Sequence, residues 1–223
     1  MKTIRCFLAV DPSLETARVL SDAQIALRDE SERAGLRVRW VPPQNLHVTL
    51  RFLGQLTEPM IRSIQDALEP IAERHPPFEM RSSGLGAFPD IERPRVIWLG
   101  VETPEDELRG LHDDVAAVLD EIGFESEPRP FHSHLTLGRV KKGSAGGAAA
   151  LAEMDPPEAG TSLVRELVCY RSDLHTDGAD YRALWRLRLR GHPRGGLRFD
   201  DEETGPEADG ENETAPDDAG EKE

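Results

Sequence analysis

Cysteine, lysine and long apolar runs are all scarce in this chain of 223 residues. Its two cysteines, Cys6 and Cys169, lie far apart in apolar surroundings, so we expect no disulfide framework and a reducing compartment. No apolar run approaches the length of a membrane span. The first residues are interrupted by polar ones too soon to form a secretory signal. We therefore expect a cytoplasmic protein with no membrane partner.

Lysine supplies only 4 of the 27 basic residues, and acidic residues outnumber basic ones by 42 to 27. Residues 200–223 carry a net charge of −11 out of −15 for the whole chain, so −4 remains for residues 1–199. This last stretch has no large apolar residue and cannot bury enough surface to offset its ordering entropy. We predict one two-lobed domain at 1–198 and an acidic, disordered tail at 199–223.

The low lysine content and the acidic tail have two explanations. One is a salt-rich cytosol, as in a halophile, and the other is a GC-rich genome; we favour the first. At molar salt the Debye length is about 3 Å, so the negative charge would scarcely repel a polyanion.

Helical and strand periodicities alternate along the chain. Three amphipathic helices are predicted, the clearest from Ile61, Ile64, Leu68 and Ile71, and Asp11 is expected to cap the first helix. Predicted strands cover 3–10, 38–43, 46–54, 78–88, 94–101, 131–140, 162–170 and 181–190. Residues 141–160 and 171–180 are expected to be loops. Mostly antiparallel strands interleaved with helices indicate the α+β class.

Two of these strands repeat the order histidine, apolar residue, threonine, leucine. His47 and Thr49 stand in NLHVTLRFLG, and His134 and Thr136 stand 87 residues later in FHSHLTLGRV. Residues i and i+2 of a strand point to one face, so each strand presents an imidazole and a hydroxyl together. Each half of the chain holds strands, a capped helix and one such strand. This pattern suggests two similar lobes that face each other across a groove.

Two imidazoles and two hydroxyls across one groove suit phosphodiester hydrolysis. Histidine titrates near neutrality, so one ring can start neutral and the other charged. The neutral ring would take a proton from water, the charged ring would protonate the leaving oxygen, and each transfer is worth about 10²–10⁴-fold in rate. The hydroxyls would donate to the non-bridging oxygens, where charge builds up. This chemistry requires no metal.

A single histidine–threonine pair is weak evidence. Seven histidines in a chain with ten threonines would give about 0.3 such pairs by chance. A structural histidine with satisfied hydrogen bonds explains one pair equally well. Two pairs, both in alternating strands and both followed by leucine, favour a functional site.

The motifs resemble a known family. WVPPQNLHVTLRFLG, GLGAFP, PRVIWLGV and FHSHLTLGRVK are similar to segments of the two-histidine (2H) phosphoesterases, within them the RNA 2',3'-cyclic phosphodiesterases, long labelled 2'-5' RNA ligases. The resemblance spans about residues 3–190. It implies a bilobal, pseudo-two-fold α+β fold with antiparallel sheets around a central cleft and helices outside. It also implies hydrolysis of terminal RNA 2',3'-cyclic phosphates to 2'-phosphomonoesters, with no cofactor.

The resemblance further implies a role for each motif residue. His47 would be the proton donor to the 3'-oxygen and His134 the proton acceptor from water, while Thr49 and Thr136 would bind the phosphate. The residue pattern alone leaves the two histidine roles interchangeable.

Two arginines are candidate substrate-binding residues, because a guanidinium suits recognition of phosphate oxygens. Arg51 continues the face of His47, although a solvated strand end is the alternative. Arg139 has the wrong parity for the face of His134, unless Gly138 allows a bulge.

Other interpretations remain open. His132 has the parity of His134 but no threonine partner, so we place it at the rim. A metal site is disfavoured because no acid stands at a ligand-like offset in either motif. A non-catalytic module that binds RNA ends or nucleotides would use the same groove. We expect a monomer that acts on RNA 2',3'-cyclic phosphate ends or a related cyclic nucleotide, and the sequence leaves open whether reversible ligation matters.

Overall fold

The computed structural model describes residues 2–33, 35–142, 160–176 and 178–192, of which the side chain of 142 is left out. Nine strands are described: β1 (Ile4–Val10), β2 (Arg37–Trp40), β3 (Val48–Leu56), β4 (Phe78–Phe88), β5 (Val96–Glu102), β6 (His134–Lys142), β7 (Thr161–Val164), β8 (Glu166–His175) and β9 (Gly178–Arg188). Three α-helices accompany them: α1 (Leu14–Arg33), α2 (Glu58–Arg74) and α3 (Glu107–Glu121). Two short 3-10 helices are η1 (Pro43–Asn45) and η2 (Pro104–Asp106).

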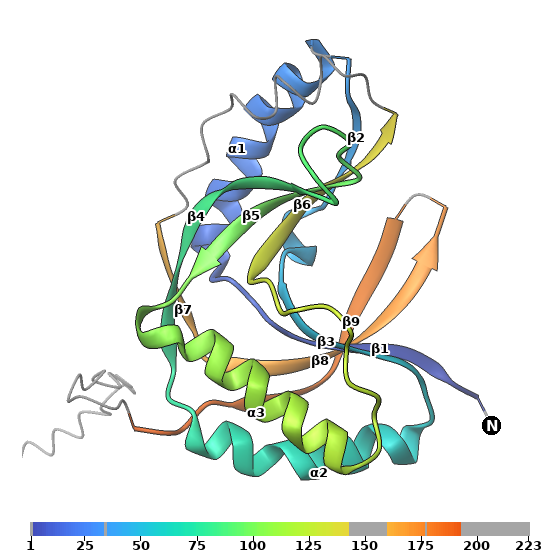
Figure 1. The fold of residues 1–223 in the computed structure, drawn as a ribbon, viewed down its shortest axis with the longest axis vertical. Helices are drawn as coiled ribbons and strands as arrows, with labels where there is room; N and C mark the ends of the chain where they lie inside the picture. The colour runs from blue at the N-terminus through green and yellow to red at the C-terminus, as the bar shows by residue number, and fades with distance from the viewer. Residues whose placement is uncertain (1, 34, 143–159, 177, 193–223) are drawn as a thin grey trace, which may run out of the picture.

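All nine strands join one strongly curled antiparallel sheet (Figure 1). The strand order is β7-β4-β5-β6-β3-β1-β8-β9, and β2 pairs with the far part of β6. β3 and β6 meet through a single residue pair, Val48 and Leu135, with three further strands on either side of them. This short contact is the seam between two lobes of the sheet. The predicted α+β class and bilobal, antiparallel architecture are confirmed.

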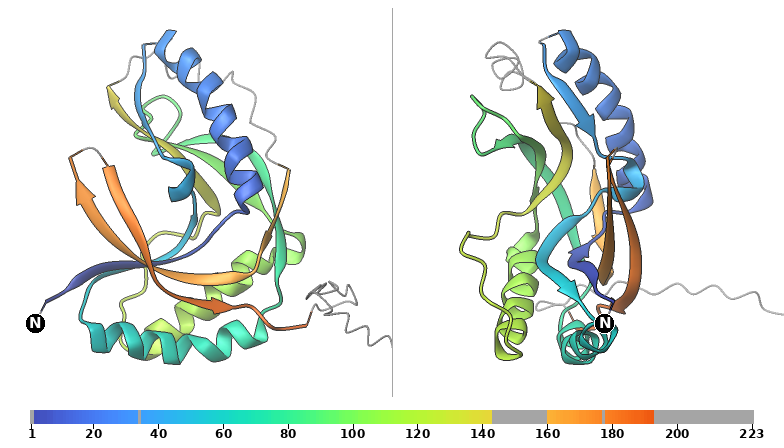
Figure 2. Two further views of the ribbon diagram at one scale, coloured as in Figure 1. Left: turned by 180° about the vertical axis from the view of Figure 1, so that it is seen from behind. Right: turned by 90° about the vertical axis from the view of Figure 1, so that its right-hand side faces the viewer.

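The helices cross between the lobes. α1, from the first half of the sequence, contacts β2, η1 and β7, behind the β4–β6 side of the sheet (Figure 2). α3, from the second half, contacts β3, and α2 contacts both α3 and β9. Each lobe therefore contains parts of both halves of the chain.

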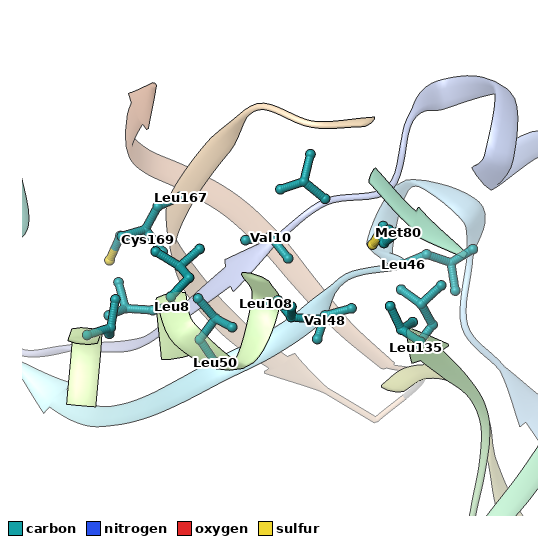
Figure 3. Packing of buried hydrophobic residues seen from close by; sticks show 14 of the residues in the cluster. Leu8, Val10, Leu46, Val48, Leu50, Met80, Leu108, Leu135, Leu167 and Cys169 are labelled. Carbon is teal, nitrogen blue, oxygen red and sulfur yellow. The ribbon is translucent and has the colours of Figure 1, made fainter. Parts of the chain in front are cut away.

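A continuous apolar core lies beneath the seam. Val48 and Leu135 are almost completely buried there, with Leu8, Val10 and Leu50 close by (Figure 3). β1 is apolar on both faces from residue 6 to residue 10, as expected for a strand covered on both sides. Because the seam residues face this core, their neighbours in β3 and β6 face the opposite side of the sheet.

Three local predictions were wrong. Asp11 does not cap α1, because the backbone N–H of Thr16 donates to Ser13 Oγ at 3.1 Å instead. The strand expected at 162–170 is divided at Arg165 into β7 and β8, which pair with β4 and with β1 and β9. The loop expected at 171–180 is mostly strand, because β8 and β9 pair as far as His175 and Gly178.

Two predicted segments lie wholly or mostly outside the described residues. The acidic tail at 199–223 lies outside the described residues, as does most of the loop at 141–160. Both cysteines are free and buried. None of the described helices is long and apolar enough to cross a membrane.

Candidate active site

The seam brings the two histidine–threonine pairs together. Because Val48 pairs with Leu135 in antiparallel register, His47 lies on the same side of this pair as Thr136, and Thr49 on the same side as His134. All four are only half-buried, whereas the seam pair faces the core. We call the side of the sheet that carries these four residues the seam face. The structure thus assembles the quartet that the sequence predicts.

A bulge in β6 adds Arg139 to the seam face. Ile97 of β5 pairs with Gly138 and the next residue, Trp98, pairs with Thr136, so β6 contributes one extra residue at this step. The bulge reverses the alternation of side chains. Arg139 therefore shares the side of Thr136, is exposed, and lies near enough to His47 and His134 to affect the pKa of both.

A second bulge removes Arg51 from the seam face. Leu8 of β1 pairs with Arg51 and Ala9 pairs with Thr49, so Leu50 is the extra residue in β3. Arg51 is consequently turned away from Thr49 and is only 4% exposed. The period-2 pattern that placed Arg51 beside the phosphate fails at this residue.

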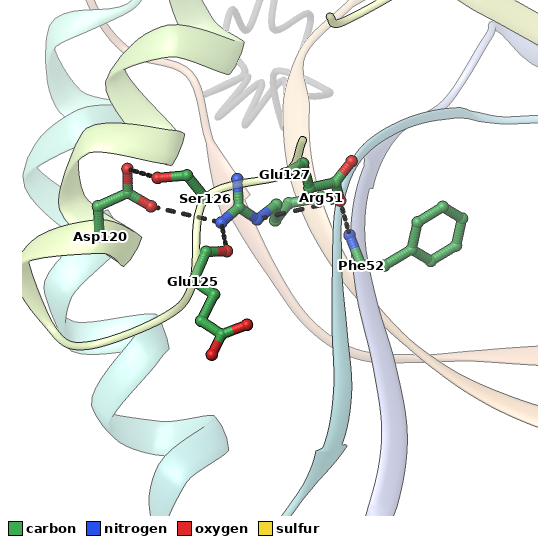
Figure 4. A network of polar contacts seen from close by, with 6 residues as sticks. All are labelled: Arg51, Phe52, Asp120, Glu125, Ser126 and Glu127. Carbon is green, nitrogen blue, oxygen red and sulfur yellow. Dashed lines mark hydrogen bonds and ion pairs between the residues drawn. The ribbon is translucent and has the colours of Figure 1, made fainter. Parts of the chain in front are cut away.

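The guanidinium of Arg51 has partners in the last turn of α3 and in the chain that follows it (Figure 4). Its Nη2 donates to Asp120 Oδ1 at 3.3 Å and to the backbone carbonyl of Glu125, and its Nε lies 4.0 Å from Glu127 Oε1. Glu127 also accepts from the backbone N–H of Phe52. These contacts attach α3 and the chain after it to β3, and they hold the guanidinium of Arg51 away from the seam face.

Both catalytic candidates orient their rings in the same way. Nδ1 of His47 lies 2.7 Å from the carbonyl oxygen of Asn45, and Nδ1 of His134 lies 2.7 Å from that of His132. A carbonyl can only accept, so each Nδ1 carries a proton. In the neutral ring, Nε2 is then the basic nitrogen. Each histidine therefore keeps Nε2 for a substrate.

Aromatic rings hold the two imidazoles in place. His47 contacts Phe7, with ring centroids 4.8 Å apart, and meets Tyr181 edge-on at 5.2 Å. On the other lobe, His134 meets Phe88 edge-on at 5.1 Å and lies 6.2 Å from Trp98. These contacts remove water from both rings and restrict their orientation.

The environment of His47 is apolar but includes one carboxylate. Burial lowers the pKa of His47 below its ordinary value, and His134 and Arg139 lower it further. The hydrogen bond to the Asn45 carbonyl and the charge of Asp11 act in the opposite direction and raise this pKa. Asp11 is thus the acidic group that favours a protonated His47.

His134 has no carboxylate in the same position. Burial lowers its pKa, as do the neighbouring His132 and Arg139, and only the hydrogen bond to the His132 carbonyl raises it. His132 itself is exposed and packs against Trp98, with centroids 4.5 Å apart. It therefore lies at the rim, where the sequence placed it.

Among the described residues, no three His, Cys, Asp or Glu side chains gather as a metal site would require.

The comparisons with known proteins agree with this geometry. A family model described as LigT-like phosphoesterase matches residues 10–98 and 99–178. The chain belongs to this family. The first match contains His47 and Thr49 and the second contains His134 and Thr136, which supports the two-lobed organisation of this LigT-like phosphoesterase.

Named relatives and solved structures show the same family. The chain is 36% identical over 164 residues to an RNA 2',3'-cyclic phosphodiesterase of Aeropyrum pernix, covering 73% of this chain and 92% of the relative. It is 35% identical over 188 residues to the protein of the same name from Methanothermobacter thermautotrophicus, covering 83% and 99%. The crystal structure of TT0787 of Thermus thermophilus superposes with a TM-score of 0.71 at 30% identity, covering 85% and 100%. E. coli LigT complexed with 3'-AMP gives 0.68 at 27%, covering 84% and 99%.

Sequence reasoning missed two contributors to the site of this LigT-like phosphoesterase. Asp11 accepts from the hydroxyl of Tyr170 at 2.6 Å and from Arg186 at 3.2 Å, so its carboxylate is fixed near His47. The Asp-Pro dipeptide resembles a helix start, which hid this role. Tyr181 was placed at the start of a strand after a loop, and only the pairing of β8 with β9 brings it to His47.

Proposed function

We propose that this LigT-like phosphoesterase hydrolyses 2',3'-cyclic phosphates at RNA ends to 2'-phosphomonoesters, with two histidines as acid and base and no metal. The observation that carries the proposal is the seam face, on which His47 and His134 each keep Nε2 for a substrate. Relatives that share about a third of the sequence over most of its length are named RNA 2',3'-cyclic phosphodiesterases. RNA with such an end, or a related cyclic nucleotide, is the proposed substrate of a monomeric enzyme.

The reaction requires two proton transfers on opposite sides of phosphorus. Nε2 of neutral His134 takes a proton from water as the water oxygen bonds to phosphorus. The bond from phosphorus to O3' breaks, and protonated His47 gives its Nε2 proton to that oxygen. The phosphate stays on O2'. Exchange with solvent then returns His134 to its neutral form and His47 to its charged form.

The surroundings of the two rings support this assignment of roles. Burial lowers the pKa of both rings; the charge of Asp11 opposes this at His47, whereas no carboxylate opposes it at His134, whose pKa Arg139 lowers further. The ring that must start charged is thus the one with the carboxylate. The resemblance to the family implies the same assignment.

The remaining groups on the seam face stabilise the negative charge of the phosphate. The hydroxyls of Thr49 and Thr136 donate to its non-bridging oxygens, where charge increases in the transition state. Arg139, which the bulge directs to this side, supplies a permanent positive charge for the same oxygens. Loss of one such donor costs about 10²–10³-fold in kcat in well-studied enzymes.

The direct test is a short RNA that ends in a 2',3'-cyclic phosphate. Incubated with the enzyme in KCl and EDTA, it is expected to open to the 2'-phosphate. His47→Ala and His134→Ala should each lose about 10²-fold or more, because each removes one proton transfer. Arg62→Gln, at an exposed position on α2, is the matched control and should retain full activity.

A module that only binds RNA ends is the second candidate, because the same surface would serve it. No ring opening at any salt concentration, with RNA binding retained, would favour that module. Activity that EDTA abolishes and divalent metal restores would contradict the metal-free mechanism. Ligation of a 5'-hydroxyl to the cyclic end is the reverse reaction through the same groups, and can be assayed with the same substrate.

A further inference from the structure

A cavity of about 670 Å³ lies directly beside His47. Its walls come from the end of β2, from η1, from Arg139 of β6 and from the β8–β9 hairpin. Two wall residues contact His47: Asn45 through its carbonyl oxygen and Tyr181 through its ring. We call this space the hairpin cavity. Its volume is within the range of about 300–1,000 Å³ that small-molecule sites occupy.

A second cavity of about 620 Å³ lies on the other lobe. It is lined by Trp98 and His132, which contact His134, and by Arg109 of α3. The four motif residues of the seam face thus lie between two cavities, one on the side of each histidine. A part of the substrate that occupies one of these cavities lies on the same side of the phosphate as the histidine next to that cavity.

In-line displacement decides which cavity faces the RNA strand. The attacking and leaving oxygens lie on roughly opposite sides of phosphorus. The leaving oxygen belongs to the terminal ribose and receives its proton from His47, so this ribose lies on the His47 side. The rest of the strand is attached to the same ribose through its 5'-oxygen. It therefore extends toward the hairpin cavity, and water approaches from the other side.

The charges of the hairpin cavity suit a phosphodiester. Three arginines line it, namely Arg39, Arg139 and Arg182. Nη1 of Arg39 donates to the Thr176 carbonyl at 3.4 Å, and the charge of Arg182 helps to lower the pKa of Asp173, but none of the three lies within ion-pair distance of a described carboxylate. Its two carboxylates already have partners. Asp173 pairs with Arg171 at 2.7 Å, and Asp180 lies 3.3 Å from His175. The arginines are therefore available to an anionic ligand.

Two aromatic side chains line the same space. Trp40 of β2 and Tyr181 of β9 both border it, and the Trp40 ring also packs against the apolar core. Trp40 pairs in register with Gly138, and a Cβ at Gly138 would lie 3.3 Å from the Trp40 ring and 2.5 Å from Val38. The glycine thus permits the close packing of β2 on β6. Aromatic faces of this kind stack bases of single strands without strong sequence preference.

We propose that the hairpin cavity is the subsite for the RNA strand 5' of the cyclic end, with Arg39 and Arg182 at the preceding phosphate and Trp40 and Tyr181 beside the bases. The inference rests on the proposed function and adds a substrate class to it. The enzyme prefers an oligonucleotide that ends in a cyclic phosphate over a cyclic mononucleotide, which has no 5' phosphodiester to bind.

The test compares two substrates: adenosine 2',3'-cyclic phosphate and an RNA trinucleotide with the same cyclic end. The parent enzyme should have at least a tenfold higher kcat/KM on the trinucleotide. Arg182→Gln, at an exposed position, should lose about tenfold on the trinucleotide and change less than twofold on the mononucleotide. The slope of log(kcat/KM) against log[salt] for the trinucleotide should become shallower by about 0.7, the value for one phosphate contact of a single strand.

The controls separate this inference from the proposed function. Arg62→Gln should leave both substrates and the salt slope unchanged. Equal kcat/KM on the two substrates, or equal losses on both in Arg182→Gln, would overturn the subsite. A length-dependent loss in Arg109→Gln instead would place the strand in the cavity beside His134. No opening of either substrate by the parent would overturn the proposed function itself.

Discussion

At the scale of single residues, chemically identical side chains receive different roles from their surroundings. His47 and His134 occur in the same motif and make the same Nδ1 contact to a carbonyl. Only His47 has a carboxylate, that of Asp11, that raises its pKa. Arg51 and Arg139 also differ in their surroundings. One bulge directs Arg51 toward acidic partners, and another directs Arg139 to the seam face.

Asp11→Asn should change the pH profile more than the fold. The pKa of His47 is already below its ordinary value of 6.5, and removing the carboxylate lowers it further. As the pH rises, His47 of the variant then loses its proton at a lower pH than His47 of the parent enzyme. The alkaline limb of kcat/KM should shift to more acidic pH, measured from about pH 5 to 8.5 in a buffer of constant ionic strength. Asp90→Asn, in the turn between β4 and β5, is the control, and an unchanged limb in Asp11→Asn would contradict the role of Asp11.

Arg51→Met should affect stability and leave catalysis intact. It removes charged hydrogen bonds to Asp120 and to the Glu125 carbonyl, each worth about 1.5–3 kcal/mol. We expect the free energy of unfolding, measured in urea, to fall by about 1.5–3 kcal/mol for each hydrogen bond that is lost. The kcat of the folded variant should stay within about twofold of the parent. A 10²-fold loss of kcat with unchanged stability would instead make Arg51 a phosphate ligand.

At the scale of elements, the site depends on close approaches of strands. Trp98 of β5 lies across its neighbour Gly86 of β4, and a Cβ on Gly86 would lie 2.3 Å from the indole ring. The same indole packs on His132, whose carbonyl oxygen orients His134. The pairing of β4 with β5 therefore controls the position of the proposed catalytic base.

Gly86→Ala should lower both stability and activity. Overpacking of this kind costs about 1–3 kcal/mol, and the displaced indole should lower kcat several-fold. Gly110→Ala is the matched control, because its Cβ would meet nothing nearer than His75 at 3.9 Å. It lies within α3, where alanine should add up to about 1 kcal/mol. Urea unfolding and ring opening of the cyclic end measure both effects. Equal stability and equal activity of Gly86→Ala and Gly110→Ala would contradict the packing argument.

At the scale of the whole molecule, the two lobes are not independent. α1 contacts β7 of the second half, and its Gln24 donates to the Leu137 carbonyl of β6; α3 contacts β3 of the first half, so each lobe needs both halves of the chain. The seam itself is a single residue pair, which leaves the adjoining faces of β3 and β6 open to a substrate. The acidic tail at 199–223 lies beyond both family matches.

Deletion of residues 200–223 should leave kcat unchanged, because the proposed chemistry uses residues of the seam face only. The deletion removes a net charge of −11. At low salt, where the Debye length is long, kcat/KM on RNA should therefore rise, and this gain should vanish at molar salt. Turnover assays of both chains at about 0.05 and 1 M KCl would show it. A large loss of kcat on deletion would assign the tail a catalytic role.

Local patterns in the chain were sufficient to predict much of this protein. Period-2 alternation placed His47 with Thr49 and His134 with Thr136, and helical spacing identified the amphipathic helices, because both patterns depend only on nearby residues. Non-local contacts decided the rest. The bulges that separate Arg51 from Arg139 depend on the register of β1 with β3 and of β5 with β6. The hairpin cavity exists because β8 and β9 pair through most of 171–180, the segment that was predicted to be a loop, and such pairing leaves no periodic signal in the chain.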